Sequence, residues 1–174
     1  MRIYVVRHGE TDVNLAGLIN SRNDSFLNET GIREAQEVRD KLNSIKFDII
    51  YSSPATRAIE TAKIIDSNIE IITDIRIHEK DAKDHTLKPI DYANRVKWWN
   101  YYTPYPEDVE TVKELCDRVF EFIEEIKNKK YENVLVTTHS GVMKAFSTYF
   151  NGIPENGDLT KYDTYHCEVR EFEI

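Results

Sequence analysis

Two histidines and two arginines stand just beyond short apolar runs of this sequence: Arg7, His8, Arg57 and His139. A guanidinium presents a planar fork of N–H donors that matches the oxygens of a phosphoryl group. A neutral imidazole is a nucleophile that can attack phosphorus, and a second imidazole can help to stabilise the equatorial oxygens. If the fold brings these four side chains together, they favour covalent phosphoryl transfer through a histidine.

Each of these residues alone has a simpler structural explanation. A lone arginine after a strand more often forms a surface ion pair, and a lone histidine there is more often a hydrogen-bonded structural residue. The occurrence of all four at equivalent places favours the functional interpretation. Zinc would need three or four ligands, and two arginines beside the histidines would repel a cation. We therefore expect neither a metal ion nor a cofactor.

Short, continuous, β-prone apolar runs predict buried strands, and apolar residues three or four positions apart predict helices. The expected strands cover residues 3–6, 47–51, 69–73 and 134–138, followed by a half-exposed edge strand over 165–174. The expected helices cover residues 30–45, 53–66, 110–129 and 141–150. The second of these helices is expected to have Ser53 as its N-cap and Pro54 at its first position.

Strands that alternate with helices predict an α/β fold, with a mostly parallel sheet, helices on both faces and one antiparallel edge strand. Such sheets bind ligands in the crevice beyond the carboxyl ends of their strands. Arg7 and His8 follow the first expected strand, Arg57 lies about one turn into the helix after the second, and His139 follows the fourth. The four side chains should therefore meet at one edge of the sheet.

The composition limits the classes of protein that this chain can be. A chain of 174 residues, 40% hydrophobic and 31% charged, is expected to form one domain over residues 1–174. It has no apolar run of about 20 residues, its N-terminus does not resemble a signal peptide, and two cysteines make no disulfide scaffold. We expect a cytoplasmic protein.

The net charge of −8 bears on the partners of the protein. Nucleic acids and anionic membranes favour clusters of lysine and arginine, so neither is expected as a partner. A small anion responds instead to the local field of its pocket, which a few arginines can make positive. The expected partner is a small phosphorylated metabolite, and a homodimer is left open.

Four segments, in this order, resemble the motifs of the histidine phosphatase superfamily, the phosphoglycerate mutase-like group. They are Arg7-His8-Gly9-Glu10-Thr11 with Asn14, Leu27-Asn28-Glu29-Thr30-Gly31, Ser52-Ser53-Pro54 with Arg57, and Thr138-His139-Ser140-Gly141-Val142. The resemblance extends over most of the chain. It implies a three-layer α/β/α sandwich and a phosphatase that works without a metal ion.

The resemblance also implies a role for each matching residue. His8 would accept the phosphoryl group and pass it to water or to a second substrate. The phosphate pocket around His8 would comprise Arg7, Asn14, Arg57 and His139, and His139 would also take part in catalysis.

Members of this family use a carboxylic acid to protonate the leaving oxygen, because an alkoxide is a poor leaving group without a proton. Glu79 lies in the matching segment after the third expected strand. The simpler alternative is a solvated loop glutamate, and His78 next to it is a lesser alternative as the proton donor. We expect His8, Glu79 and His139 to be the catalytic residues.

Three departures from the family pattern bear on the substrate. Residues 80–86 contain no glycine where the family has a glycine-rich segment, Leu18 stands where an arginine is usual, and Val109 replaces a glycine. The missing arginine removes a cation for an acidic substrate, and the chain is short for a mutase. We expect a broad-specificity phosphomonoesterase; the alternatives are a phosphoglycerate-type mutase and a catalytically weak, phosphate-binding regulatory module.

Residues 80–108 are expected to form a cap or wall over the pocket. Their aromatic side chains either line the pocket or pack a small subdomain over the sheet. These aromatic residues are Trp98, Trp99, Tyr101, Tyr102 and Tyr105. The basic residues Lys88, Arg95 and Lys97 could meet a charged substrate or lie on a solvated helix face, and we expect the solvated face.

Overall fold

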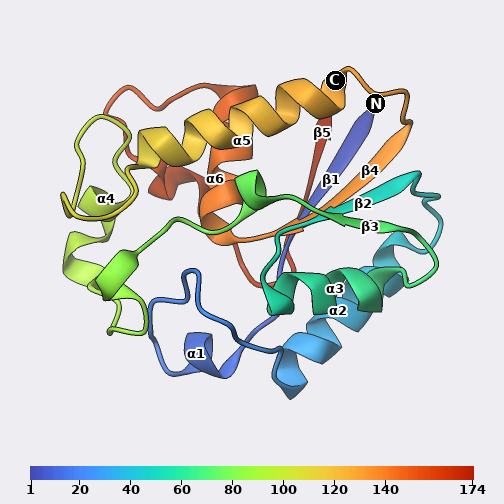
Figure 1. Cartoon of the computed structure of the whole chain (residues 1–174), viewed down its shortest axis with the longest axis horizontal. Helices are drawn as coiled ribbons and strands as arrows, with labels where there is room; N and C mark the ends of the chain where they lie inside the picture. Colours follow the sequence, from blue (N-terminus) through green and yellow to red (C-terminus); the bar gives the residue numbers. More distant parts are fainter.

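A five-stranded sheet runs through the centre of the computed structural model, which describes residues 1–174 (Figure 1). Its strands lie in the order β3-β2-β4-β1-β5. Four of them run parallel, and β5 pairs antiparallel with β1 at one edge. The strands are β1 (Arg2–Arg7), β2 (Ile49–Ser52), β3 (Ile71–Thr73), β4 (Asn133–Thr138) and β5 (Val169–Glu173). The predicted sheet, with its antiparallel edge strand, is confirmed.

Helices cover both faces of this sheet. Helices α5 (Val112–Lys127) and α6 (Ser140–Asn151) lie on one face, and α2 (Glu29–Leu42) and α3 (Thr56–Ile65) lie on the other (Figure 1). The short elements are α1 (Asp12–Leu15), α4 (Arg95–Trp98) and the 3₁₀ turns η1 (Ile75–Ile77), η2 (Lys83–His85), η3 (Tyr92–Asn94) and η4 (Leu159–Tyr162). The three-layer α/β/α sandwich is therefore confirmed.

Side chains of β1 alternate between the two faces, as the pleat of a strand requires. Ile3 and Val5 pack in the cluster with α5 and α6, whereas Tyr4 and Val6 pack in the cluster with α2 and α3. Burial on both faces explains why this strand reads as a continuous apolar run and not as an alternating one.

Two of the helices begin at side chains that satisfy their free N–H groups. Thr111 and Glu114 form a capping box at the start of α5, so this helix begins at Val112. Asn28 accepts a hydrogen bond from the backbone of Gly31, so α2 begins at Glu29. The sequence placed these helices correctly, although α5 is shorter than the expected 110–129 and α2 ends at Leu42.

The prediction that Ser53 caps the helix after β2 is wrong. Helix α3 begins at Thr56, its N-cap is Ala55 without any side-chain bond, and Pro54 lies outside it. The Ser53 hydroxyl instead accepts a bond from the backbone of Ala55 and lies 2.7 Å from a nitrogen of His139. Ser53 therefore contacts His139 and does not cap the helix.

The antiparallel edge strand is shorter than the expected 165–174. Residues 165–168 form a turn closed by a bond from the Glu168 N–H to the Tyr165 carbonyl, and β5 starts at Val169. This turn carries His166 over the carboxyl end of β1, beside Arg7. At the opposite edge, β3 is likewise shorter than the expected 69–73 and begins at Ile71.

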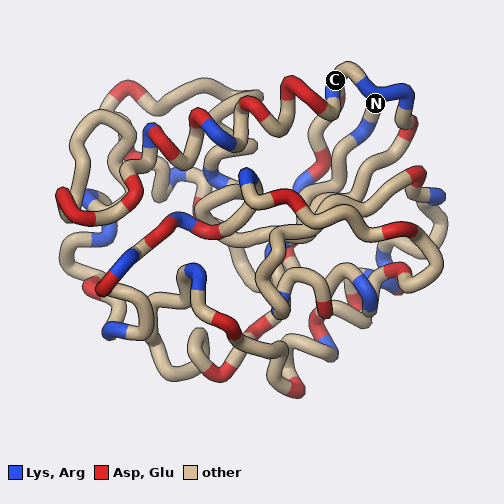
Figure 2. Tube along the Cα trace, viewed as in Figure 1, with Lys and Arg blue, Asp and Glu red and all other residues tan.

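The two termini lie next to each other, and the charged residues are spread over the whole chain. The Met1 amino group donates to the Ile174 carbonyl at 2.7 Å, so the two termini are adjacent (Figure 1). Acidic and basic residues are interspersed along the whole trace (Figure 2). None of the helices has the length and apolar character that a membrane crossing requires.

Candidate active site

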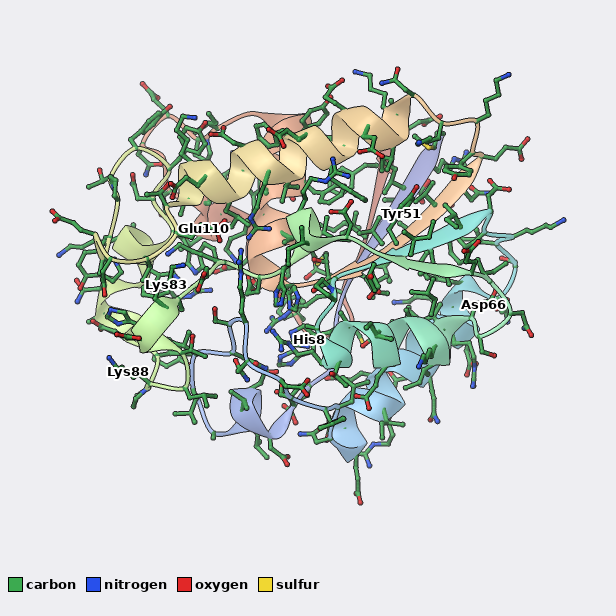
Figure 3. All side chains as sticks on the ribbon, viewed as in Figure 1. His8, Tyr51, Asp66, Lys83, Lys88 and Glu110 are labelled. Carbon is green, nitrogen blue, oxygen red and sulfur yellow. The ribbon has the colours of Figure 1, made fainter.

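His8 lies directly beyond the end of β1 and is almost completely buried (Figure 3). Its Nδ1 is 2.7 Å from the carbonyl oxygen of Gly9, which can only accept, so Nδ1 carries the proton. The guanidinium Nε of Arg57 donates to His8 Nε2 at 3.2 Å. These two contacts select one neutral tautomer, in which Nε2 holds the free electron pair.

The environment of His8 keeps its imidazole neutral. Burial lowers the pKa of His8 well below its usual value, and the positive charges of Arg57 and Arg7 lower it further. A neutral ring is the form that attacks phosphorus. The ring of His8 therefore keeps the electron pair on Nε2 free of a proton at neutral pH.

Arg57 is fully buried and is fixed by the loop that precedes α2. Its Nη1 donates to the Asn23 carbonyl and the Ser25 hydroxyl, and its Nη2 donates to the Ser21 carbonyl at 2.6 Å. Burial lowers the pKa of Arg57 to about 10, so the guanidinium still carries its charge at neutral pH. These hydrogen bonds fix the guanidinium so that its Nε points toward His8.

His139 follows β4 at the start of α6 and is fully buried. Arg57 Nη2 donates to its Nδ1 at 3.3 Å, which leaves Nε2 to donate to the Ser53 hydroxyl at 2.7 Å. Its ring lies edge-on to that of His8, with centroids 5.2 Å apart. Burial, with Arg57 beside it, lowers the pKa of His139 well below its usual value.

Arg7 contributes an unused donor. Its Nη1 donates to the Thr164 carbonyl at 2.7 Å and its Nη2 to His166 Nε2 at 2.9 Å, whereas its Nε is buried without any partner. Buried polar groups are normally paired, so this Nε is a donor that lacks an acceptor within the protein. Burial, with Arg7 beside it, lowers the pKa of His166 to about 4, and the neutral ring accepts from Arg7.

Asn14 lies in α1 and lines the same cavity as His8. Its Oδ1 accepts bonds from the N–H and the hydroxyl of Thr11, which form a capping box around this short helix. The amide Nδ2 makes no hydrogen bond within the protein and is the group that can donate to a ligand.

Glu79 also lines the cavity. Its Oε1 accepts from the backbone N–H of Lys80 at 2.8 Å, and its Oε2 accepts from the N–H of Gly141 at 3.2 Å. The carboxyl group is therefore fixed above the start of α6. His78, the lesser alternative, stacks on His139 with centroids 5.5 Å apart and is not among the residues that line the cavity.

A cavity of about 600 Å³ opens over these residues. His8 and Arg7 form part of its lining, whereas Arg57 and His139 lie behind His8 and do not line it. The structure thus brings the four predicted residues together as two layers, one exposed to a ligand and one that supports it. No group of three or more His, Cys, Asp or Glu side chains is arranged to hold a metal ion.

The aromatic residues of the segment 80–108 divide between the two expected roles. Trp98, Trp99 and Tyr105 line the cavity, whereas Tyr101 packs against the core and Tyr102 is exposed. Lys88 and Arg95 line the cavity, which agrees with the alternative to the expected solvated face, whereas Lys97 does not line it. Several residues between positions 85 and 95 contribute to the cavity lining, which helical spacing does not reveal.

Three further residues of the site are not predicted by the sequence. His166 supports Arg7, and the buried lysines Lys80 and Lys144 line the cavity. Lys80 directly follows Glu79, and Lys144 lies about one turn beyond Ser140. Neither position carries a distinct sequence signal, because a lysine in a charged segment or on a helix is normally solvated.

Comparisons with known proteins agree with this geometry. A family model described as the histidine phosphatase superfamily (branch 1) matches residues 3–174. The chain is 35% identical over 152 residues to the 2,3-bisphosphoglycerate-dependent phosphoglycerate mutase of Thermoplasma acidophilum, covering 84% of this chain and 74% of that protein. It is 29% identical over 164 residues to the adenosylcobalamin/alpha-ribazole phosphatase of Escherichia coli, covering 88% and 81%.

A solved structure shows the same fold. That of Bacillus stearothermophilus YhfR has a TM-score of 0.89 to this chain at 26% identity. The match covers 99% of this chain and 91% of the other.

Proposed function

Because this chain belongs to the histidine phosphatase superfamily (branch 1), we propose that it hydrolyses a small phosphorylated metabolite through a phosphohistidine on His8, without a metal ion. The observation that carries the proposal is the tautomer of His8. A proton held on Nδ1 by the Gly9 carbonyl leaves Nε2 as the attacking atom, beside the charged Arg57.

In the first step, His8 Nε2 attacks phosphorus, and the bond between phosphorus and the ester oxygen breaks. The incoming phosphoryl group takes the place of the resting contact between Arg57 and Nε2. Arg7 Nε and Asn14 Nδ2, which have no partner within the protein, donate to phosphoryl oxygens. Glu79 in its acid form gives its proton to the leaving alkoxide.

In the second step, the Glu79 carboxylate accepts a proton from water, and the hydroxide attacks phosphorus. The bond between phosphorus and Nε2 breaks, which releases inorganic phosphate and restores both His8 and the acid form of Glu79. Arg57 and His139 act throughout by holding His8 and by balancing charge beneath it. Small leaving groups of many shapes fit a cavity of about 600 Å³, which supports a broad specificity.

The test is hydrolysis of an aryl phosphate in the presence of a chelator. We expect turnover that a chelator does not reduce and that His8→Ala lowers to the uncatalysed rate. Denaturation in alkali during turnover should trap a phosphoryl group on the wild-type chain only, because the P–N bond of a phosphohistidine survives alkali and is lost in acid. Activity that requires an added metal ion, or a His8→Ala variant that remains active, would overturn the proposal.

The acid role of Glu79 has its own test. Glu79→Gln keeps the size of the side chain but has no proton to give, so alkyl phosphates should lose about 10²–10⁴-fold in rate. A nitrophenyl phosphate, whose leaving group needs no proton, should lose much less in the phosphorylation step. Equal losses on both substrates would assign Glu79 to binding and not to proton transfer.

A mutase is the second candidate, because the relative in Thermoplasma acidophilum is named as one. The phosphoryl group on His8 would then pass to a second hydroxyl and not to water. Isomerisation of a phosphoglycerate with a bisphosphate primer measures this directly. If no isomer is detected at an enzyme concentration that gives fast hydrolysis, the mutase is excluded and the phosphatase remains as the proposed activity.

A further inference from the structure

The segment that carries Glu79 has no regular secondary structure of its own. The turn η1 ends at Ile77, and no helix or strand covers residues 78–82. The backbone N–H and C=O groups of such a segment need partners from elsewhere in the protein. Those partners decide where the Glu79 side chain lies.

Arg118 of α5 supplies partners for three backbone carbonyls of this segment. Its Nη1 donates to the carbonyl of Arg76 at 2.6 Å and to that of His78 at 2.8 Å. Its Nη2 donates to the carbonyl of Glu79 itself at 3.1 Å. One guanidinium therefore joins the chain on the approach to Glu79, and the Glu79 backbone, to a helix of the core.

Glu110, just before the start of α5, holds the Arg118 guanidinium in this orientation (Figure 3). Its carboxylate accepts from Arg118 Nε at 2.6 Å and from Nη2 at 2.9 Å, the bidentate pairing that a planar guanidinium favours. Glu110 also accepts from the Asp81 N–H at 2.8 Å, and its own N–H donates to the Asp81 carbonyl at 3.0 Å. With these bonds, every N–H donor of the guanidinium has an acceptor.

This ion pair does not touch the cavity. Neither Arg118 nor Glu110 lines it, and their side chains are only 16% and 11% exposed. Glu79 does line the cavity, and its carboxyl accepts from the N–H groups of Lys80 and Gly141. Arg118 is thus connected to the cavity through the backbone that carries Glu79.

Two other arginines lie at this segment, and neither holds its backbone in the same way. Arg22 approaches the Glu79 carbonyl only at 3.4 Å, and its side chain is 34% exposed. The Arg76 side chain pairs with Asp74 and with Glu125 of α5. Arg76 therefore joins the same segment to the same helix without bonding to the backbone around the acid.

Resting on the proposed function, we propose that Arg118, held by Glu110, is the positioning residue for the acid Glu79. It fixes the backbone so that the carboxyl stays within hydrogen-bond reach of the leaving oxygen, which proton transfer requires. A displacement of about 1 Å can cost about 10²-fold in rate. Arg7 and His8, which hold the phosphoryl group, do not bond to Arg118.

Arg118→Met tests this role through the dependence of the rate on the leaving group. The variant keeps a long apolar stem but has no donors for the carbonyls. We expect kcat/KM for alkyl phosphates to fall by about 10–10²-fold. For nitrophenyl phosphate, whose leaving group needs no proton, kcat/KM should fall much less. The inhibition constant of inorganic phosphate should not change, because the phosphoryl pocket is intact.

Three further variants assign the loss to the position of Glu79. Arg76→Met is the matched control and should keep the wild-type ratio between alkyl and aryl substrates. Arg118→Lys should behave like Arg118→Met, because one ammonium cannot replace the planar fork that bonds to Glu110 and to three carbonyls. Arg118→Met with Glu79→Gln should be no slower on alkyl phosphates than Glu79→Gln alone, since both changes remove the same proton transfer.

Circular dichroism and the melting temperature establish that each variant is folded. If Arg118→Met does not fold because Glu110 is left without a partner, Arg118→Met with Glu110→Gln removes the unpaired charge and carries the same expectation. Equal losses on alkyl and aryl phosphates would mean that Arg118 only stabilises the fold, and would overturn the inference. So would an unchanged ratio in Arg118→Met, or a shift of the same size in Arg76→Met. If the wild type hydrolyses both substrates and one of these results is found, the inference fails and the proposed function stands.

If no phosphate ester is hydrolysed, the proposed function fails first. Amide hydrogen exchange then still reports on the position of Glu79 without turnover, through the two N–H groups that donate to its carboxyl, those of Lys80 and Gly141. Faster exchange of both in Arg118→Met, but not in Arg76→Met, would support the positioning role. Equal exchange in the wild type and both variants would overturn it.

Discussion

The Glu79 carboxyl packs directly against the backbone of Gly141. A Cβ at Gly141 would collide with Glu79 Oε1 and would lie 2.9 Å from the indole ring of Trp99. The absence of a side chain at this position lets the Glu79 carboxyl accept from the Gly141 N–H. The position of the proposed acid thus depends on Gly141, a glycine within the second histidine motif.

Gly141→Ala should therefore reproduce the kinetics of Glu79→Gln. The added methyl group displaces the carboxyl, so alkyl phosphates should lose about 10²–10⁴-fold in rate, while nitrophenyl phosphate should lose much less in the phosphorylation step. The control is the double variant with Glu79→Gln, which should be no slower than the slower single variant. Independent, multiplicative losses in the double variant would contradict this coupling.

The burial of Lys80 predicts how the free energy of unfolding changes with pH. Its pKa is about 8 in the folded protein and about 10.4 in an unfolded chain, so the unfolded state binds more protons between these values. The free energy of unfolding should therefore rise with pH from about 8 to 10, by roughly 2–3 kcal/mol in all.

Urea unfolding of the wild type and of Lys80→Met at pH 7 to 10 isolates this contribution. The variant should be the more stable protein at pH 7, and the difference should shrink as the pH rises. Lys83→Met should follow the wild type. A difference that is constant with pH would show that the Lys80 ammonium carries no burial penalty.

At the scale of the elements, the turns at the carboxyl ends of the strands gather neutral imidazoles. His8 and His139 follow β1 and β4, His78 follows η1, and the turn before β5 carries His166. Burial is the main cause that lowers the pKa of each of them, to about 4 for His78 and His166. The site is therefore a group of rings that resist protonation.

This arrangement predicts a loss of stability in mild acid. Unfolded histidines take up protons near pH 6.5, but these four do so in the folded protein only at lower pH, so the unfolded state binds more protons between about 6.5 and 4. The free energy of unfolding should fall as the pH drops through this window. His78→Gln, whose amide can still accept from Glu79 N, should remove roughly 2 kcal/mol of that fall after allowance for solvent screening. A wild type equally stable at pH 7 and 5 would contradict the prediction.

Helix α5 covers one face of the sheet and depends on its first turn. Thr111 accepts from the Glu114 N–H, and Glu114 bonds back to the Thr111 N–H. Thr111→Ala should cost about 1 kcal/mol in the free energy of unfolding, whereas Thr111→Gly should cost only a few tenths. Chemical unfolding of the two variants checks this order. If both lower the free energy of unfolding equally, the lost cap is not the cause.

At the scale of the whole molecule, the termini and the site lie at opposite ends of the parallel strands. The Met1 amino group bonds to the Ile174 carbonyl, whereas His8 follows the carboxyl end of β1 (Figures 1 and 3). The loop after Asp66 lies at the end of α3, also remote from the cavity lining. The molecule thus separates its termini from the residues that line the cavity.

A circular permutant tests this separation. Joining residues 174 and 1 by a short flexible linker and opening the chain after Asp66 should give a folded enzyme within about tenfold of wild-type kcat/KM, because exposed turns tolerate new termini. Opening the chain after Leu87 instead, in the segment that lines the cavity, should lower kcat/KM far more. Circular dichroism of both permutants separates loss of fold from loss of activity. Similar activities in both would mean that the segment 80–108 is dispensable.

The sequence alone determined the layers of the molecule and the edge of the sheet at which Arg7, His8 and His139 lie. The runs at β1 and β4 are buried on both faces and therefore continuously apolar, and α5 carries its apolar residues at helical spacing, so local pattern and burial agree. Arg7, His8 and His139 lie at strand ends that a parallel sheet brings to one edge. Their meeting followed from topology and not from any local signal.

Only the tertiary structure decided how the site is completed. Ser53 looks like a helix cap in sequence but bonds to His139, which is 86 positions away, and His166 supports Arg7 from the far end of the chain. The unpaired state of Lys80 is a property of everything that surrounds it. Such contacts join residues distant in sequence, and neither periodicity nor spacing encodes them, because they depend on how the loops pack after the sheet has formed.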